Sequence, residues 1–161
     1  MTPSRRAVAV AGHTGDEATA RLGVTSDEPE VRATALGALE RLGALDDATL
    51  TDAFSDLAVG VRRRAAEIAA AHPAVDLVPL LDDADPRVVE VAAWACGEHE
   101  SDRTAVVERL IELASVAGDP LVRESAVAAL GAIGDPRAVV TIITATHDKP
   151  AIRRRAVLAL A

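Results

Sequence analysis

The sequence predicts an all-α fold, a right-handed α-α superhelix of about five helix pairs. The stretch 119–135, DPLVRESAVAALGAIGD, predicts a helix: Asp119 is a good N-cap, Pro120 fits the first turn and Gly134 fits the exit. Weaker copies of it recur before and after, at a spacing near 30 residues. Such a period is typical of helical-repeat solenoids, in which each repeat packs only on its neighbours.

Overlaying the copies gives columns of equivalent residues. The first column, with spacings of 30, 27, 34 and 30 residues, holds Val31, Val61, Val88, Val122 and Ile152. Four residues later stand Ala35, Ala65, Ala92, Ala126 and Ala156. The next turn holds Leu39, Ala69, Cys96, Leu130 and Leu160. Residues four apart share one helix face, so we expect these columns to be buried, with close helix packing at the alanines. The position after the first column reads Arg32, Arg62, Val89, Arg123 and Arg153.

The elements follow in order from the caps and the columns. Residues 4–11 predict a short capping helix. The outer helices of the pairs are expected at 16–22, 46–56, 74–81, 102–117 and 136–146. The inner helices are expected near 29–42, 59–71, 86–98, 120–133 and 150–161. No stretch shows strand alternation or a low-complexity linker, so residues 1–161 are predicted to form a single domain.

Several residues match a known repeat signature, D-x-D-P-x-V-R-x-x-A-x-x-A-L-G-x-L-G-D. They are Asp83, Asp85, Pro86, Val88 and Ala92, and then Asp119, Pro120, Val122, Arg123, Ala126, Leu130, Gly131, Gly134 and Asp135. The chain thereby resembles HEAT repeats of the short bacterial and archaeal type named after the phycocyanobilin lyases. The resemblance covers nearly the whole chain and implies an armadillo-like superhelix. It implies no single function, because the family includes enzymes, scaffolds and adaptors.

Composition and charge restrict the setting. Half of the residues are apolar, yet there is one Trp, one Phe and no Tyr, so the core must be built from small side chains. One cysteine excludes an internal disulfide and favours a reducing cytoplasm. No apolar run approaches the length of a membrane span. The net charge of -8 argues against general affinity for nucleic-acid backbones or anionic lipid.

A helical wheel anchored at Val31 predicts which residues of the inner helices face solvent on the concave side. One row reads Ala33, Arg63, Glu90, Glu124 and Arg154. The next row reads Gly37, Glu67, Trp94, Ala128 and Leu158. An exposed Trp brings a large apolar area with little entropy to lose, so Trp94 is a candidate binding hot spot. The alternative is that Trp94 fills the shortened third repeat.

Two arginine triplets, 62–64 and 153–155, stand between a column Val or Ile and the column Ala. The first Arg of each triplet occupies the repeat's own Arg column, where the HEAT resemblance implies pairing with carboxylates in the connecting loops. The surplus arginines are Arg63, Arg64, Arg154 and Arg155. They are candidates to bind carboxylates or phosphates in bidentate fashion, with solvated surface charge as the other interpretation.

Nucleic-acid binding and metal catalysis are two more specific alternatives to a protein-binding role. HEAT-like alkylpurine DNA glycosylases have an Arg-lined groove, but here Glu90 and Glu124 separate the Arg clusters and aromatic residues are scarce. Deoxyhypusine hydroxylases, also HEAT-like, hold iron with several His-Glu pairs. The segment Glu98-His99-Glu100 supplies one such pair, whereas His72 is followed by Pro73. One pair does not make a multi-ligand site, so we predict neither a metal nor another cofactor.

The end of the sequence repeats the buried columns at Ile152, Ala156 and Leu160, without a polar closing helix. Either the natural chain continues or this edge associates with a second copy. The sequence as a whole predicts a non-catalytic scaffold or adaptor that binds another protein or peptide through its concave inner-helix face. The alternatives are an accessory domain that positions an enzyme partner, and a nucleic-acid-binding protein that uses the Arg clusters.

Overall fold

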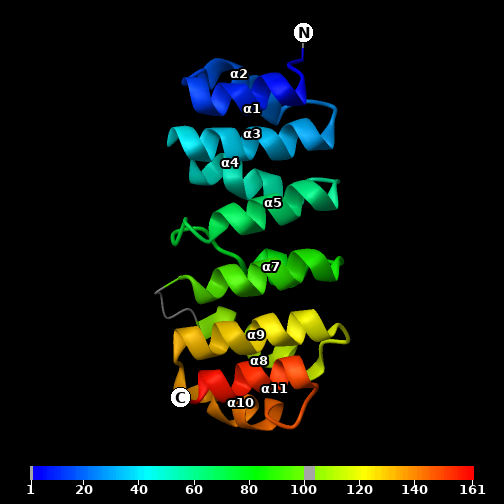
Figure 1. The fold of residues 1–161 in the computed structure, drawn as a ribbon, viewed down its shortest axis with the longest axis vertical. Coiled ribbons are helices and arrows are strands. Elements are labelled where there is room, and N and C mark those ends of the chain that lie inside the picture. The colour runs from blue at the N-terminus through cyan, green and yellow to red at the C-terminus, as the bar shows by residue number, and fades with distance from the viewer. Residues whose placement is uncertain (1, 100–103) are drawn as a thin grey trace. The chain divides into compact units, whose positions relative to one another are not determined.

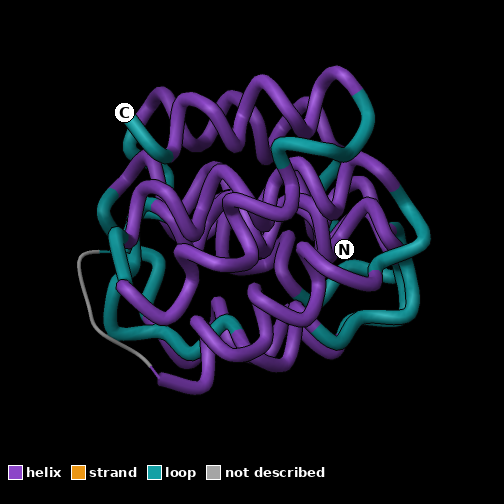
Figure 2. Tube along the Cα trace, turned by 90° about the horizontal axis from the view of Figure 1, so that it is seen from below, coloured by secondary structure: helices purple, strands orange, loops and turns teal. Residues whose placement is uncertain are grey.

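Helices joined by short loops make up the computed structural model, which describes residues 2–99 and 104–161 (Figures 1 and 2). Helix accounts for 74% of the described residues, which contain no strand, and this confirms the all-α prediction. The chain divides into two compact units, Met1–Ile68 and Ala69–Ala161. A single domain over 1–161 remains a prediction, and each unit is described by itself.

In the first unit, α3 is packed on one side by α1 and α2. Its elements are α1 (Arg5–Thr14), α2 (Glu17–Val24), α3 (Pro29–Leu42), α4 (Asp47–Asp52) with the 3₁₀ turn η1 (Ala53–Ser55), and α5 (Val59–Ala69). The side chains of Ser4, Asp16 and Asp46 accept hydrogen bonds from backbone N–H groups at the starts of α1, α2 and α4. These caps satisfy donors that have no partner within a helix, so they fix where each helix begins.

In the second unit, α9 packs against α7, α8 and α11 (Figure 1). Its elements are α6 (Val78–Leu81), α7 (Pro86–Gly97), α8 (Thr104–Val116), α9 (Pro120–Ile133), the 3₁₀ turn η2 (Pro136–Ala138), α10 (Val139–Ala145) and α11 (Pro150–Ala159). Asp85 and Asp119 cap α7 and α9, each followed by a proline in the first turn. The helix predicted at 120–133 is confirmed residue for residue.

The outer helices differ most from the prediction. The helix expected at 74–81 begins only at Val78, because Pro79 lacks an N–H and fits the first turn but not the interior of a helix. Asp76 Oδ1 accepts a hydrogen bond from the backbone N–H of Val78 at 3.0 Å, which caps this late start. The outer helix expected from Asp102 is described from Thr104, and Asp102 lies outside the described residues.

The predicted buried columns form the core, with one exception. All five alanines of the second column have 0% of their surface exposed, and the five residues of the first column are at most 3% exposed. The third column is buried up to Leu130, but its last member, Leu160, is 46% exposed. Helix α11 ends at Ala159, so Leu160 no longer lies on the packed face.

Two arginines of the arginine column, Arg32 and Arg123, link their inner helices to the loops around them. Arg32 Nε and Nη2 donate to the two carboxylate oxygens of Asp56 at 2.7 Å each. Its Nη1 also donates to the carbonyl oxygen of Ser26 at 2.8 Å. In the second unit, Arg123 repeats this pattern with Asp148 (2.9 and 3.2 Å) and the carbonyl of Ala117 (2.6 Å). Bidentate, charge-assisted bonds of this kind fix geometry as well as adding stability.

These ion pairs also change the acid response of the fold. Hydrogen bonds from Arg32 and Arg123 hold the pKa of Asp56 and of Asp148 below the ordinary carboxyl value of 3.8. A carboxyl whose pKa is lower in the folded chain stabilises the fold at pH values above its unfolded pKa. That contribution is lost as the pH falls through the lowered, folded pKa.

We predict that Arg123→Gln lowers the free energy of unfolding by about 1–3 kcal/mol at neutral pH, because it removes the guanidinium that donates to the Ala117 carbonyl and to the Asp148 carboxylate. Arg153 belongs to the same column, but it is exposed and forms no ion pair within the described residues. Arg153→Gln is therefore the matched control, with an expected change within about 0.5 kcal/mol. Urea denaturation followed by circular dichroism measures both.

Repeating the denaturation below the lowered pKa of Asp148 supplies a second check. The carboxyl is then protonated in both proteins, so the difference between Arg123→Gln and the wild type is expected to shrink. Equal losses for Arg123→Gln and Arg153→Gln at neutral pH would contradict a structural role for the pair.

Candidate functional site

A hollow lies over the exposed side of the inner helices in each unit. The first, named here the arginine hollow, lies over α1, α3 and α5, with a volume of about 470 Å³. The second, the tryptophan hollow, lies over α7 and α9 and is bordered by Arg155 of α11, with a volume of about 400 Å³. The two hollows differ in charge, because arginines predominate in the first and glutamates in the second.

Trp94 is the largest side chain of the tryptophan hollow and is 45% exposed, as the helical wheel predicted. The small residues beside it bring α7 and α9 close together. A Cβ placed on Gly97 would lie 3.0 Å from the Cα of Ala129. The floor is therefore backbone and alanine, above which the indole stands free to contact a ligand.

Three carboxylates line the hollow together with this indole. Glu90 and Glu98 come from α7, and Glu124 comes from α9. Arg155 Nε donates to Glu124 Oε1 at 3.2 Å and is the hollow's one positive side chain. Glu98 is the C-cap of α7, where the helix dipole already contributes negative charge. The hollow thus combines an aromatic face with a surplus of negative charge, which attracts cations and repels phosphates.

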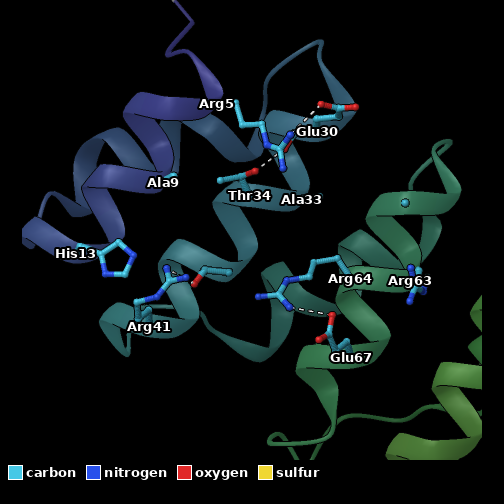
Figure 3. Close-up of a pocket in the computed structure, with 12 residues that line it drawn as sticks. Arg5, Ala9, His13, Glu30, Ala33, Thr34, Arg41, Arg63, Arg64 and Glu67 are labelled. Atoms are coloured by element: carbon cyan, nitrogen blue, oxygen red, sulfur yellow. Dashed lines mark hydrogen bonds and ion pairs between the residues drawn. The ribbon is translucent and has the colours of Figure 1, made fainter.

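The arginine hollow has the opposite sign, and Figure 3 shows its side chains converging from three helices. Arg5 Nη1 pairs with Glu30 at 3.2 Å, and Arg64 Nη1 pairs with Glu67 at 2.8 Å. Arg41 Nη1 donates to the carbonyl oxygen of Gly37 at 3.1 Å. Arg64 reaches from α5 toward α3, on the side where Arg41 and His13 lie (Figure 3).

The structure divides the predicted contact residues between the two hollows. Glu90, Trp94, Glu124 and Arg155 line the tryptophan hollow, whereas Arg63, Arg64 and Glu67 line the arginine hollow. Arg154 is exposed and lines neither. Their roles in binding remain predictions.

Gly37 differs from the prediction that its row faces solvent, because the residue is buried. The guanidinium of Arg64 covers it: a Cβ on Gly37 would lie 2.6 Å from Arg64 Nη2. The helical wheel considers one helix at a time, so it misses a side chain that arrives from the next repeat.

Sequence reasoning also missed several lining residues. Arg5 and His13 belong to α1, for which the sequence predicts only a capping role over 4–11, and Arg41 lies one turn beyond the rows of the helical wheel. Glu98, a candidate metal ligand by sequence, and Leu121, which no predicted column or row includes, both line the tryptophan hollow. The sequence contains one relevant signal, Gly37, which stands where other repeats carry Glu67 and Trp94.

A metal centre has no support in residues 2–99 and 104–161, where no three His, Cys, Asp or Glu side chains gather closely enough to hold an ion. His99 is buried, with its Nε2 2.8 Å from the carbonyl oxygen of Ala69. Cys96 is buried as well, as its column predicted. Glu100 of the predicted Glu-His-Glu segment lies outside the described residues.

The proposed C-terminal association edge is mostly inaccessible. Ile152 and Ala156 are both 0% exposed because α11 packs them against α9 and α10. Only Leu160 of the three predicted residues is available to a second chain.

None of the helices in the described ranges has the length and apolar character needed to cross a membrane.

Comparison with known proteins decides the family. The family model for HEAT repeats matches residues 74–161, more than half of the chain. This protein belongs to the HEAT-repeat family. A search of curated proteins gave no match to this HEAT-repeat chain.

Solved structures agree on the fold. A designed armadillo repeat protein in complex with the peptide (KR)4 is 19% identical, with a TM-score of 0.68 over 99% of this chain and 86% of that one. An engineered protein is 19% identical, with a TM-score of 0.64 and coverages of 99% and 83%. Human deoxyhypusine hydroxylase in complex with glycerol is 20% identical, with a TM-score of 0.57 and coverages of 97% and 66%. These identities establish the helical-repeat fold of the HEAT-repeat chain and nothing finer.

Trp94 is the only tryptophan, so its fluorescence tests the geometry of the tryptophan hollow directly. Because nearly half of the side chain is exposed, we expect acrylamide to quench the emission of the folded HEAT-repeat chain, less strongly than in urea. If acrylamide quenched Trp94 fluorescence only after unfolding, the result would contradict the exposed position of Trp94. It would favour an indole that is buried in the third repeat.

Proposed function

We propose that this HEAT-repeat chain is a non-catalytic scaffold that binds a basic, extended segment of another protein in the tryptophan hollow. The observation that supports this proposal best is an exposed indole bordered by three carboxylates on adjacent helices α7 and α9. An accessory subunit that positions an enzyme would use the same docking step. The two roles differ only in what the docked partner does.

The chemistry of the hollow selects for cationic side chains. A Lys or Arg side chain laid on Trp94 gains cation–π attraction and buries its methylene groups on the ring. Its charged end then lies near Glu90 and Glu98, neither of which forms an ion pair within the described residues. An acidic segment would face like charges at the same points and bind weakly.

The fold provides a suitable support for an extended ligand. Because α7 and α9 approach closely at Gly97 and Ala129, the floor is low and a peptide backbone has room beside the indole. A designed armadillo repeat protein of similar fold is in complex with the basic peptide (KR)4. That similarity of fold favours a basic peptide as the ligand of a helical-repeat surface such as this one.

We predict that a fluorescein-labelled (KR)4 peptide binds the wild-type protein saturably in an anisotropy titration. Trp94→Ala is expected to raise the Kd about tenfold or more, which corresponds to about 1.4 kcal/mol. Leu158→Ala is the matched control, because Leu158 is an exposed apolar residue of the same predicted row that lies outside the hollow.

Net negative charge alone also attracts a basic peptide, so a second pair of variants separates local from diffuse attraction. Glu90→Gln removes a carboxylate of the hollow, whereas Glu108→Gln removes an exposed carboxylate on α8. We expect the first to weaken binding and the second to have little effect. The tryptophan hollow would be rejected as the docking site if Trp94→Ala and Leu158→Ala changed the Kd equally, and Glu90→Gln and Glu108→Gln did so too.

A further inference from the structure

The arginine hollow carries positive charge on a strongly acidic chain. Its lining contains four arginines, Arg5, Arg41, Arg63 and Arg64, against two glutamates, Glu30 and Glu67. The local excess of two positive charges stands against a net charge of -8 for the whole sequence. Charges on exposed surfaces are screened over about 8–10 Å, so the hollow's own residues decide what binds there.

The excess positive charge of the arginine hollow can be assigned to particular arginines. Arg5 and Arg64 each have a glutamate partner within the hollow. Arg41 bonds only to a backbone carbonyl, and Arg63 forms no ion pair within the described residues. Only one nitrogen of Arg64, Nη1, donates to Glu67. The other guanidinium nitrogens are therefore available to a ligand over α3.

Glycines create the places that two of these guanidinium groups occupy. A Cβ on Gly37 would lie 2.6 Å from Arg64 Nη2 and 3.3 Å from Arg64 Nε, so any larger residue would displace that head group. A Cβ on Gly12 would lie 2.8 Å from Arg41 Nη1 and 2.9 Å from the Cα of Ala38, so this glycine also permits close helix packing. Arg64 from α5 and Arg41 from α3 therefore both reach the backbone of Gly37.

Of the two guanidinium groups that approach Gly37, Arg64 pairs with Glu67 through one nitrogen, and Arg41 has no carboxylate partner within the described residues. We propose that the arginine hollow binds a phosphate group. A phosphate monoester carries about -1.5 to -2 charges at neutral pH, which matches the local excess of two, and its oxygens accept bonds from several guanidinium forks at once. The small side chains of Ala9 and Ala33 also line the hollow beside these groups.

This site is distinct from affinity for a nucleic-acid backbone. A run of phosphates would extend beyond the local positive charge and meet an acidic surface, whereas one phosphate group fits within a hollow of about 470 Å³. Free phosphate and a phosphorylated side chain of a peptide present the same group. The proposal concerns that group and does not depend on peptide binding at Trp94.

The experiment is a ¹H–¹⁵N NMR titration of the full chain with sodium phosphate at pH 7, with ionic strength held constant by sodium chloride. We expect saturable shifts at the amides of α3 and α5 around Gly37. Two eight-residue peptides that differ only in serine or phosphoserine form a second arm. Shifts at Gly37 with the phosphoserine peptide but not with the serine peptide extend the result to a protein-borne phosphate.

Gly37→Ala tests the geometry while keeping every charge. The new methyl group displaces the head of Arg64, so we expect the Kd for phosphate to rise about fivefold or more. Gly60→Ala is the matched control, because Gly60 lines the same hollow and its added Cβ meets no atom within 4 Å. Arg41→Gln is expected to weaken binding similarly, with the exposed Arg154→Gln as its control.

Three results would overturn the proposal. The first is shifts that grow linearly with phosphate without saturating. The second is equal affinity in Gly37→Ala and Gly60→Ala, with circular dichroism confirming that both are folded. The third is equal loss in Arg41→Gln and Arg154→Gln, which would mean that diffuse charge rather than the hollow attracts the anion.

Discussion

Close approach of neighbouring helices is the constraint on which the rest of the structure depends, and small residues make it possible. Every repeat places an alanine at the same position, and all five are fully buried. In the second unit, α9 lies against both α7 and α11. Gly97 meets Ala129 on one side, and Gly131 meets Ala159 on the other. With so few aromatic residues, the core gains its stability from many short contacts rather than a few large side chains.

The arginine column complements this packing by securing the loops. Arg32 and Arg123 each join the start of an inner helix to the loop before it and to a carboxylate 24 or 25 residues further on. With helices and loops fixed in this way, one exposed row is free to vary between repeats. Gly37 admits an arginine from the next repeat, whereas Trp94 projects into solvent among carboxylates. The same repeat position thus gives hollows of opposite charge in the two units.

The repeat pattern predicted those features that depend on local sequence. The cap at Asp119, the buried alanines and the exposure of Trp94 all follow from spacing within one helix. The start of α6 also depends on local sequence, and Pro79 should have indicated it. The composition of the hollows is different, because side chains from separate helices meet there. Arg64 over Gly37, and Arg5 beside Glu30, follow only from tertiary structure.

Enlarging one alanine of the buried column tests most directly whether these alanines set the spacing of the helices. Ala126→Leu places a larger side chain where no surface is exposed, and we expect it to lower the free energy of unfolding by about 1–3 kcal/mol or more. Ala128→Leu, two residues away on the half-exposed row of the same helix, is expected to change it by about 0.5 kcal/mol or less. Urea denaturation of the two variants beside the wild type measures the difference. Equal stability of the two variants would contradict the claim that the alanine column sets the helix spacing.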